Sequence, residues 1–263
     1  MTQLERLDYL LDAFKEDSGR YKNLQVEENI EDKRAALRSL MNVRMPGPMD
    51  DEVLAVQDEY LSRRVAEKGI VSLEDIPLNS GKISIWQGDI TLLKVDAIVN
   101  AANSQMLGCF VPMHACIDNC IHTFAGIQLR LECCRKMEEL RSIHGKSYEQ
   151  PTSVPLLTDA YNLPARKVIH VVGPIVSGPL AIEHEKALAA CYTNVLDMCL
   201  ENALRSVAFC CISTGVFHFP NQRAAEIAID TVKDWLSKYP DSMDRVIFNV
   251  FKDADRRLYE QLL

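Results

Sequence analysis

Three side chains in a short segment have the types and spacing of metal ligands. Cys109, His114 and Cys116 form a Cys-x4-His-x-Cys group beside a proline. Two thiolates and an imidazole suit Zn²⁺, and a single loop can supply all three ligands. A structural zinc site closes with a fourth protein ligand, whereas a catalytic site leaves that position open. Cys120 and His122 are possible fourth ligands, on the helix that Cys116 is expected to open.

Spacing alone leaves two other interpretations of this group open. Buried cysteines often serve as small apolar packing residues. Alternatively, Cys109 is a nucleophile with His114 as its base, as in thiol hydrolases. The other histidines are expected to be ordinary residues: His122, His144, His170, His184 and His218.

Polar side chains follow two other predicted strands. Asn100 and Asn103 come at the end of a short buried strand, where amides can orient a polar ligand or only cap a turn. Asp89 follows an edge strand in a Gly-Asp turn. Its carboxylate can accept from an adenine amino group or a ribose hydroxyl, although turn chemistry alone also explains this dipeptide.

A third loop, residues 213–217, joins a buried strand to a helix. Its small residues expose backbone N–H groups that can hold a phosphate together with the helix N-terminus. The loop matches neither the Walker A pattern nor the dinucleotide-fold glycine pattern, so it also fits an ordinary connector. Its members are Ser213, Thr214, Gly215, Val216 and Phe217.

The elements that position these loops alternate between strands and helices. Residues 1–80 show only helical periodicity, with apolar residues at steps of three and four. Beyond residue 82 we expect strands at 82–87, 96–100, 168–172, 207–212 and 246–251, and helices at 183–204, around 224–236 and at 253–263. This order predicts an α/β domain whose site lies at the carboxyl ends of the strands.

The charge and the ends of the chain restrict its partners. The net charge of −8 argues against non-specific binding to nucleic acid or anionic lipid as the main role. No apolar run approaches the length of a membrane span, and the N-terminus resembles no secretory signal, so we expect a cytoplasmic protein. Nine cysteines, an odd number, indicate reduced thiols.

Together these segments resemble the macrodomain family in order and spacing, from residue 82 to the end of the chain. The motifs that carry the resemblance are QGDIT (87–91), VDAIVNAANS (95–104), AYNLPARKVIHVVGP (160–174) and STGVF (213–217). The resemblance implies a three-layer α/β/α macrodomain with a mixed central sheet over 81–263, preceded by a helical extension over 1–80. It also implies a site for ADP-ribose, and many members hydrolyse ADP-ribose from proteins.

One departure from the common family pattern is informative. The glycine run that many hydrolytic macrodomains carry is replaced here by GCFVPMHAC (108–116). This segment is similar to the zinc-dependent macrodomains of bacteria and fungi, which also carry an N-terminal helical extension. The resemblance implies that Cys109, His114 and Cys116 bind zinc at the distal ribose. A second departure, the glycine missing after Pro151-Thr152, has no evident effect on the site.

The resemblance also implies roles position by position. Asp89 and the Ile90 backbone would contact adenine, residues 213–217 the phosphates, and Phe251 would stack on the base. Asn100 and Asn103 would line the distal ribose, with Asn103 and Asp118 catalytic. The expected function is zinc-dependent removal of mono-ADP-ribose from acidic side chains of proteins. The alternatives are a module that binds ADP-ribose without cleaving it, or an inert macrodomain on a helical scaffold.

Overall fold

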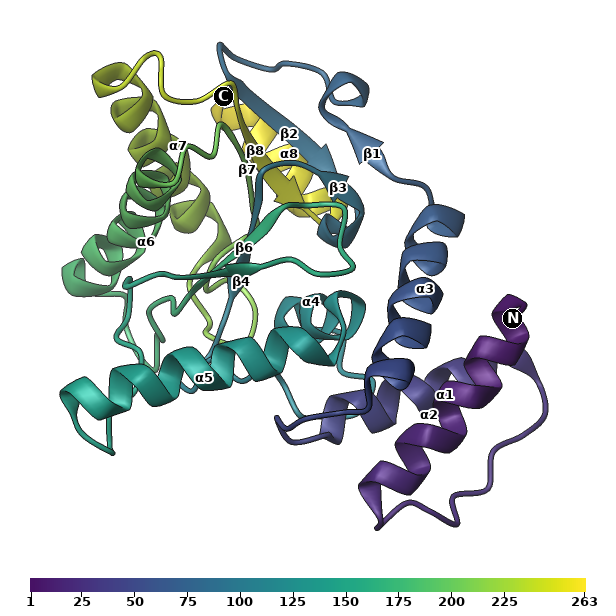
Figure 1. The fold of residues 1–263 in the computed structure, drawn as a ribbon. Helices are drawn as coiled ribbons and strands as arrows, with labels where there is room; N and C mark the ends of the chain where they lie inside the picture. Colours follow the sequence, from purple (N-terminus) through teal and green to yellow (C-terminus); the bar gives the residue numbers. More distant parts are fainter.

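Six strands form the central sheet of the computed structural model, which describes residues 1–263 (Figure 1). Across the sheet the order is β2 (Ile83–Gln87), β8 (Arg245–Val250), β7 (Ser206–Phe209), β4 (Ala97–Ala101), β6 (Lys167–Val171) and β5 (Leu156–Asp159). The first five strands are mutually parallel, and β5 pairs antiparallel with β6. The predicted mixed sheet is therefore confirmed, and the carboxyl ends of five strands lie at one edge.

Helices cover both faces of this sheet, which confirms the three-layer α/β/α architecture (Figure 1). One outer layer holds α6 (Ile182–Glu201), α7 (Asn221–Lys238) and α8 (Asp253–Leu262). Tyr192 of α6 and Tyr259 of α8 both pack against Phe248 of β8, so these two helices share a face. The opposite layer holds α4 (Ile117–Ala125) and α5 (Ile127–His144).

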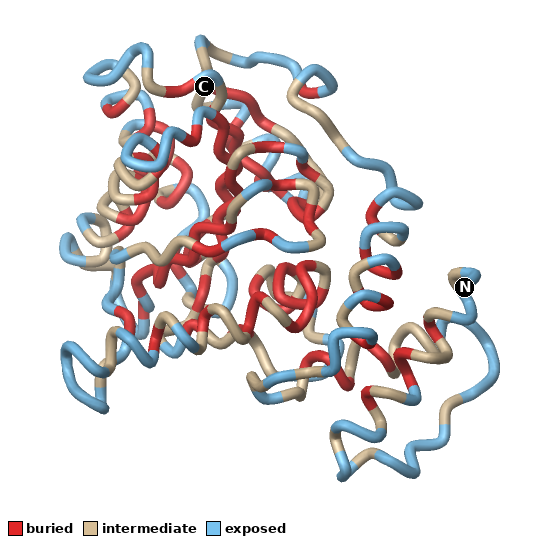
Figure 2. The backbone as a smooth tube through the Cα atoms, in the orientation of Figure 1, coloured by how far each residue is buried: buried red, intermediate tan, exposed pale blue.

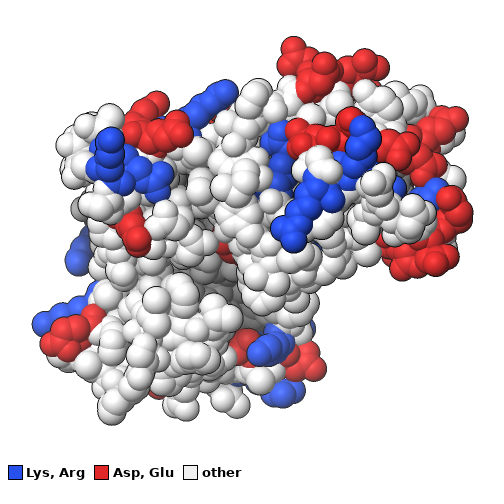
Figure 3. All heavy atoms as spheres, turned by 90° about the horizontal axis from the view of Figure 1, so that it is seen from below, with Lys and Arg blue, Asp and Glu red and all other residues white.

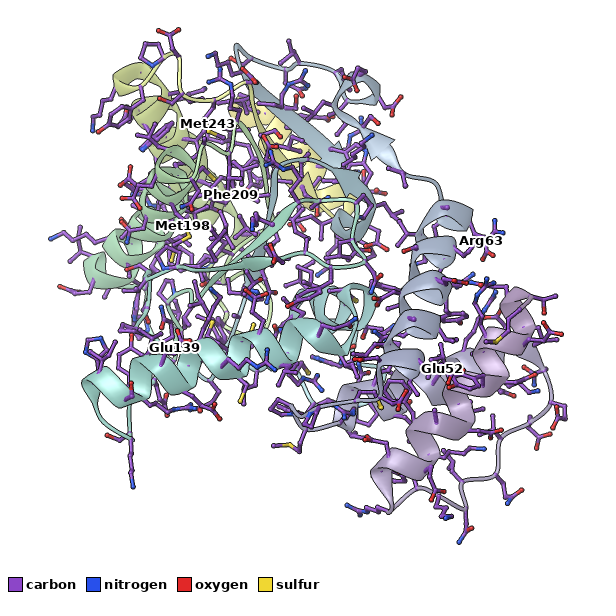
Figure 4. The ribbon with its side chains drawn as sticks, viewed as in Figure 1. Glu52, Arg63, Glu139, Met198, Phe209 and Met243 are labelled. Carbon is purple, nitrogen blue, oxygen red and sulfur yellow. The ribbon has the colours of Figure 1, made fainter.

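The main hydrophobic core lies between the sheet and its helices, where the buried segments of Figure 2 concentrate. Phe209 and Phe248 are register partners on β7 and β8, and both are almost fully buried. In Figure 4, Phe209 lies inside the fold, whereas Arg63 and Glu139 project from the outer surfaces of their helices. None of the helices combines the length and the apolar character that crossing a membrane requires.

A second, smaller core holds the N-terminal helices together. We call α1 (Gln3–Ser18), α2 (Ile30–Val43) and α3 (Asp51–Lys68) the helical unit. Its periodic apolar residues, among them Leu10, Phe14 and Leu37, form a separate cluster that Ile127 of α5 joins. After α3 come the short strand β1 (Val71–Ser72) and the 3-10 helix η1 (Leu73–Asp75). Strand β1 pairs with β3 (Leu93–Lys94), which follows a second 3-10 helix, η2 (Ile90–Leu92). The helical unit thus packs beside α4 and α5 (Figure 1).

The structure differs from the expected elements at the ends of two strands and in several elements that were not expected. The strand expected at 207–212 ends at Phe209, because the chain turns into the following loop although Cys210 and Ile212 stay buried. The strand expected at 246–251 ends at Val250, so Phe251 lies outside the ladder. The sequence pattern predicted neither α5 nor β5, nor the two-residue strands β1 and β3. Strand β5 has only four residues, most of them partly exposed, and lacks a buried-strand pattern.

Candidate functional site

Three loops leave the same edge of the sheet. Residues 88–89 follow β2, residues 102–116 follow β4, and residues 210–220 follow β7. These three strands are parallel, so the loops leave the sheet at the same edge, although residues 88–89 and 210–220 lie more than 100 residues apart in sequence. The predicted site residues are therefore brought to one edge of the sheet, together with Phe251 at the end of β8.

The segment of residues 108–116, which we call the cysteine loop, gathers its three candidate ligands. Cys109 Sγ lies 3.5 Å from His114 Nδ1, and these two atoms and Cys116 Sγ all lie within 4.8 Å of one another. Tetrahedral zinc, with bonds of about 2.3 Å to sulfur and about 2.1 Å to nitrogen, holds such atoms roughly 3.6 Å apart. The donor set fits zinc, and neither Cys120 nor His122 belongs to it.

The shape of the cysteine loop depends on close contacts at its start. Gly108 has a φ of +78°, and a Cβ there would lie 2.7 Å from the ring of His122. The guanidinium of Arg130, from α5, lies 4.3 Å from the centre of the Phe110 ring and donates to the Leu107 carbonyl. At position 108, only glycine can adopt the positive φ and leave room for the His122 ring.

A buried carboxyl group lies directly behind the cysteine loop. Asp118 stands in the first turn of α4, which Cys116 caps by accepting from the backbone N–H of Asn119 through Sγ. Asn100 donates to Asp118 Oδ1 at 2.8 Å and Asn103 donates to Oδ2 at 3.3 Å. Burial raises the pKa of Asp118 to about 6, although the Asn100 hydrogen bond lowers it. Asp118 therefore gains a proton at a higher pH than an exposed aspartate does.

The two asparagines of the site have different positions. Asn100 is fully buried, and its amide donates to Asp118 and lies 3.0 Å from His170 Nδ1. Asn103 is partly exposed and also donates to the Gly108 carbonyl. Asn100 thus supports the Asp118 carboxyl from inside the protein, whereas Asn103 is the amide that can meet a ligand.

Two histidines that the sequence analysis treated as ordinary lie behind this carboxyl. His170, opposite Asn100 in the β4–β6 ladder, has Nδ1 facing that amide donor and Nε2 3.0 Å from Thr158 Oγ1. Because Nδ1 must accept, the proton is on Nε2. His122 Nε2 lies 3.6 Å from Asp118 Oδ1. The sequence offered one sign of this role, since each of these histidines stands within a buried apolar segment.

The loop predicted to hold phosphate approaches a second turn closely. Ser213 is buried with a φ of +64°, and the Phe217 carbonyl accepts from the backbone N–H of Val176. A Cβ at Gly173 would lie 2.1 Å from Ser213 Oγ, so glycine is required where these loops meet. Gly215 and the side chain of Val216 face solvent. The exposed part of the loop is thus free to contact a ligand.

At the β2 end, Asp89 makes the local hydrogen bonds of a turn. Its Oδ1 accepts from the backbone N–H and the hydroxyl of Thr91, and its Oδ2 lies 3.4 Å from Lys68 Nζ of α3. Ile90 has a buried side chain, so only its backbone is available to a ligand. Phe251 exposes 76% of its surface beside Gln87, which donates to its carbonyl.

Seen from below, the molecule has a hollow near its middle (Figure 3). Atoms of uncharged residues line most of this hollow, and Lys, Arg, Asp and Glu side chains gather around it and over the helical unit. An anionic ligand therefore meets few fixed negative charges there, despite the net charge of −8.

The three-layer fold and the site loops at one edge of its sheet define the macrodomain class. A family model for the Macro domain matches residues 99–228. The chain belongs to the macrodomain family. Its relatives include a protein-ADP-ribose hydrolase of Treponema medium, 47% identical over the full length of both chains. Another, a protein-ADP-ribose hydrolase of Staphylococcus aureus strain Mu50, is 43% identical over 98% of this chain and 95% of its own.

Solved structures show the same fold. The Trypanosoma brucei macrodomain in complex with ADP-ribose superposes with a TM-score of 0.64 at 28% identity, covering 89% of this chain and 96% of that one. The Oceanobacillus iheyensis macrodomain with ADP gives a TM-score of 0.60 at 32% identity, covering 71% of this chain and 93% of that one. The larger coverage of the relatives from Treponema medium and Staphylococcus aureus includes the helical unit.

The neutral state of His170 predicts how stability depends on pH. Burial lowers its pKa from 6.5 to about 3, so at pH 5 the unfolded chain binds a proton that the folded chain does not. The free energy of unfolding should fall on acidification, and from pH 7 to pH 5 wild type should lose about 2 kcal/mol more than His170→Asn. Denaturant titration at both pH values measures this difference.

His144→Asn is the matched control, because His144 is exposed on α5. This variant should keep the pH dependence of wild type. An equal pH dependence in His170→Asn and wild type would contradict a neutral, buried His170.

Proposed function

We propose that this protein is a zinc-dependent hydrolase that removes mono-ADP-ribose from acidic side chains of modified proteins. The observation that carries the proposal is the convergence of Cys109 Sγ, His114 Nδ1 and Cys116 Sγ within 4.8 Å, next to the Asp118 carboxyl. Full-length relatives bear the name protein-ADP-ribose hydrolase, and the macrodomain of Trypanosoma brucei binds ADP-ribose. These names support hydrolysis, whereas zinc and the linked residue type are our inference.

The cysteine loop would hold the metal with its two sulfurs and one ring nitrogen, leaving one coordination position open. When bound there, zinc supplies Lewis acidity next to the distal ribose. Burial raises the pKa of Cys116 to about 12, so without a cation this thiol stays protonated. A metal held by Cys109 and His114 would occupy both groups of the alternative thiol mechanism, which is an argument against Cys109 as a nucleophile.

The polar residues would position and activate the reactants. The Asn103 amide would orient the distal ribose, so that water approaches C1″ as its bond to the carboxylate of the target breaks. Asp118 would accept the proton of that water, and a pKa of about 6 suits a base near neutral pH. The products are ADP-ribose and the free acidic side chain.

The rest of ADP-ribose would extend along the edge of the sheet. Backbone N–H groups of residues 213–217 would neutralise the diphosphate without adding cationic side chains. Asp89 and the Ile90 backbone would bind adenine, and the exposed Phe251 ring would stack on it. The partners of this protein are then ADP-ribose and a mono-ADP-ribosylated protein.

Removing one sulfur tests the metal. Cys116→Ala leaves two ligands, so we expect zinc in the purified protein to disappear and kcat to fall by a factor of about 100 or more. Elemental analysis and hydrolysis of a protein modified on a carboxylate, with and without chelator, measure both. Cys134→Ala is the control, because that thiol lies on α5, outside the cysteine loop, and its hydrogen bond goes to Glu138.

The outcomes separate the candidate functions. Full activity in metal-free Cys116→Ala would exclude a catalytic zinc. Activity without metal in wild type, lost in Cys109→Ala, would support the thiol mechanism. Tight binding of ADP-ribose with no turnover would identify a binding module. Cleavage of arginine-linked but not carboxylate-linked ADP-ribose would contradict the acidic linkage.

Asn103→Ala should reduce turnover more than binding. Its amide would meet only the distal ribose, so we expect kcat to fall about 100-fold and the Kd of ADP-ribose to rise less than about tenfold. Single-turnover hydrolysis and calorimetric titration give the two numbers. Equal losses in both would restrict Asn103 to binding.

Asp89→Ala should weaken ADP-ribose binding. Loss of a charge-assisted hydrogen bond to the adenine amino group should raise the Kd about tenfold or more. The ratio of the Kd values of ADP-ribose and ribose 5-phosphate, compared between wild type and variant, assigns the loss to the AMP half of the ligand. An unchanged Kd for ADP-ribose would refute the contact.

A further inference from the structure

The helical unit contacts the cysteine loop directly at its backbone. Arg38 Nη2, on α2, donates to the His114 carbonyl at 2.9 Å, and Asn42 Oδ1, one turn later, accepts from the Met113 backbone N–H at 3.0 Å. These hydrogen bonds join parts of the chain more than 70 residues apart. They fix both the candidate ligand His114 and the residue before it.

A buried amide links Arg38 to the rest of the loop. Asn119 is fully buried in α4, and its Oδ1 accepts from Arg38 Nη2 at 2.8 Å. Its Nδ2 donates to the carbonyls of Cys109 at 3.3 Å and Val111 at 3.0 Å. Its backbone N–H lies 3.4 Å from Cys116 Sγ. Arg38 and Asn119 together therefore contact the loop at each of its three candidate ligands.

The cysteine loop needs this external support because it holds itself weakly. It contains no helix or strand, and one internal backbone hydrogen bond, from His114 to the Val111 carbonyl, closes its tip. The backbone of Met113 has a φ of +57°, a conformation that residues other than glycine rarely adopt. About half of the Met113 surface is exposed. Ordering such a segment costs conformational entropy that its own contacts do not offset.

We infer that α2 orders the metal site, with Arg38 and Asn42 as positioning residues for the cysteine loop. By fixing the peptide units around His114, they direct its Nδ1 toward the two sulfurs before a metal binds. This inference rests on the proposed zinc function. It gives the helical unit a role in preparing the ligand set, in addition to its own packing.

Arg38→Met tests the inference in the full chain. Methionine keeps an unbranched apolar side chain and removes the donors, so we expect the zinc dissociation constant to rise about 10- to 100-fold, as for other groups that orient ligands. Competition with a chromogenic chelator measures it. Arg34→Met is the matched control: Arg34 lies one turn earlier on α2 and pairs with Glu31 at 2.8 Å.

Amide hydrogen exchange gives a readout that needs neither zinc nor activity. In metal-free protein, Asn42→Ala should lose protection at the Met113 amide, and Arg38→Met should increase exchange across residues 109–116. Asn42 also donates to Thr123 at 2.8 Å and is buried, so its removal can loosen α2 against α4. Arg38 is only partly buried but also donates to Asn119 of α4, so the unfolding midpoint of the metal-free protein is measured for both variants.

The outcomes distinguish positioning from simple stability. Positioning predicts weaker zinc binding and faster loop exchange, with the unfolding midpoint of the metal-free protein close to wild type. An unchanged zinc constant in Arg38→Met would overturn the inference, as would a loss that follows the unfolding midpoint. If wild type binds no zinc, the proposed function fails, and exchange at residues 109–116 still decides whether α2 orders the loop.

Discussion

The site depends on bringing two sulfurs and a ring nitrogen together in a loop without regular structure. Neither a helix nor a strand sets the spacing of Cys109, His114 and Cys116, so their convergence within 4.8 Å requires contacts from outside the loop. Arg130 of α5 holds the beginning of the loop, Asn119 of α4 its middle, and α2 its tip. Three elements from two hydrophobic cores thus order one short segment.

Much of the fold could be predicted from the sequence because its strands are buried on both faces. The segments at 97–99 and 207–212 are continuous apolar runs, the pattern typical of central parallel strands. Their ends were harder to predict, since Ile212 is as buried as a strand residue although it lies in a loop. The antiparallel β5 lacks that pattern, because most of its residues are partly exposed at the sheet edge.

Spacing alone could indicate the candidate site only where its members are close in sequence, whereas Asp89, residues 213–217 and Phe251 were indicated by the family resemblance. The cysteine loop and the two asparagines lie within 17 residues, and their spacing together with the family resemblance indicated them. The supporting residues come from elsewhere in the chain: His170 reaches Asn100 across 70 positions and Arg38 reaches His114 across 76. Spacing along one sequence cannot show such contacts, because they arise only when β4 pairs with β6 and α2 packs against α4.

The distribution of charge explains how an acidic protein can accept a diphosphate. Residues 1–80 contain 17 acidic and 11 basic side chains, so most of the net charge of −8 lies on the helical unit and its connector. Charges more than about 8 Å away are largely screened at physiological ionic strength. The hollow of Figure 3 is lined mainly by uncharged residues. The backbone N–H groups of residues 213–217 would hold an anion without a cluster of lysines. The helical unit can thus carry the charge that favours solubility and still support the cysteine loop through α2.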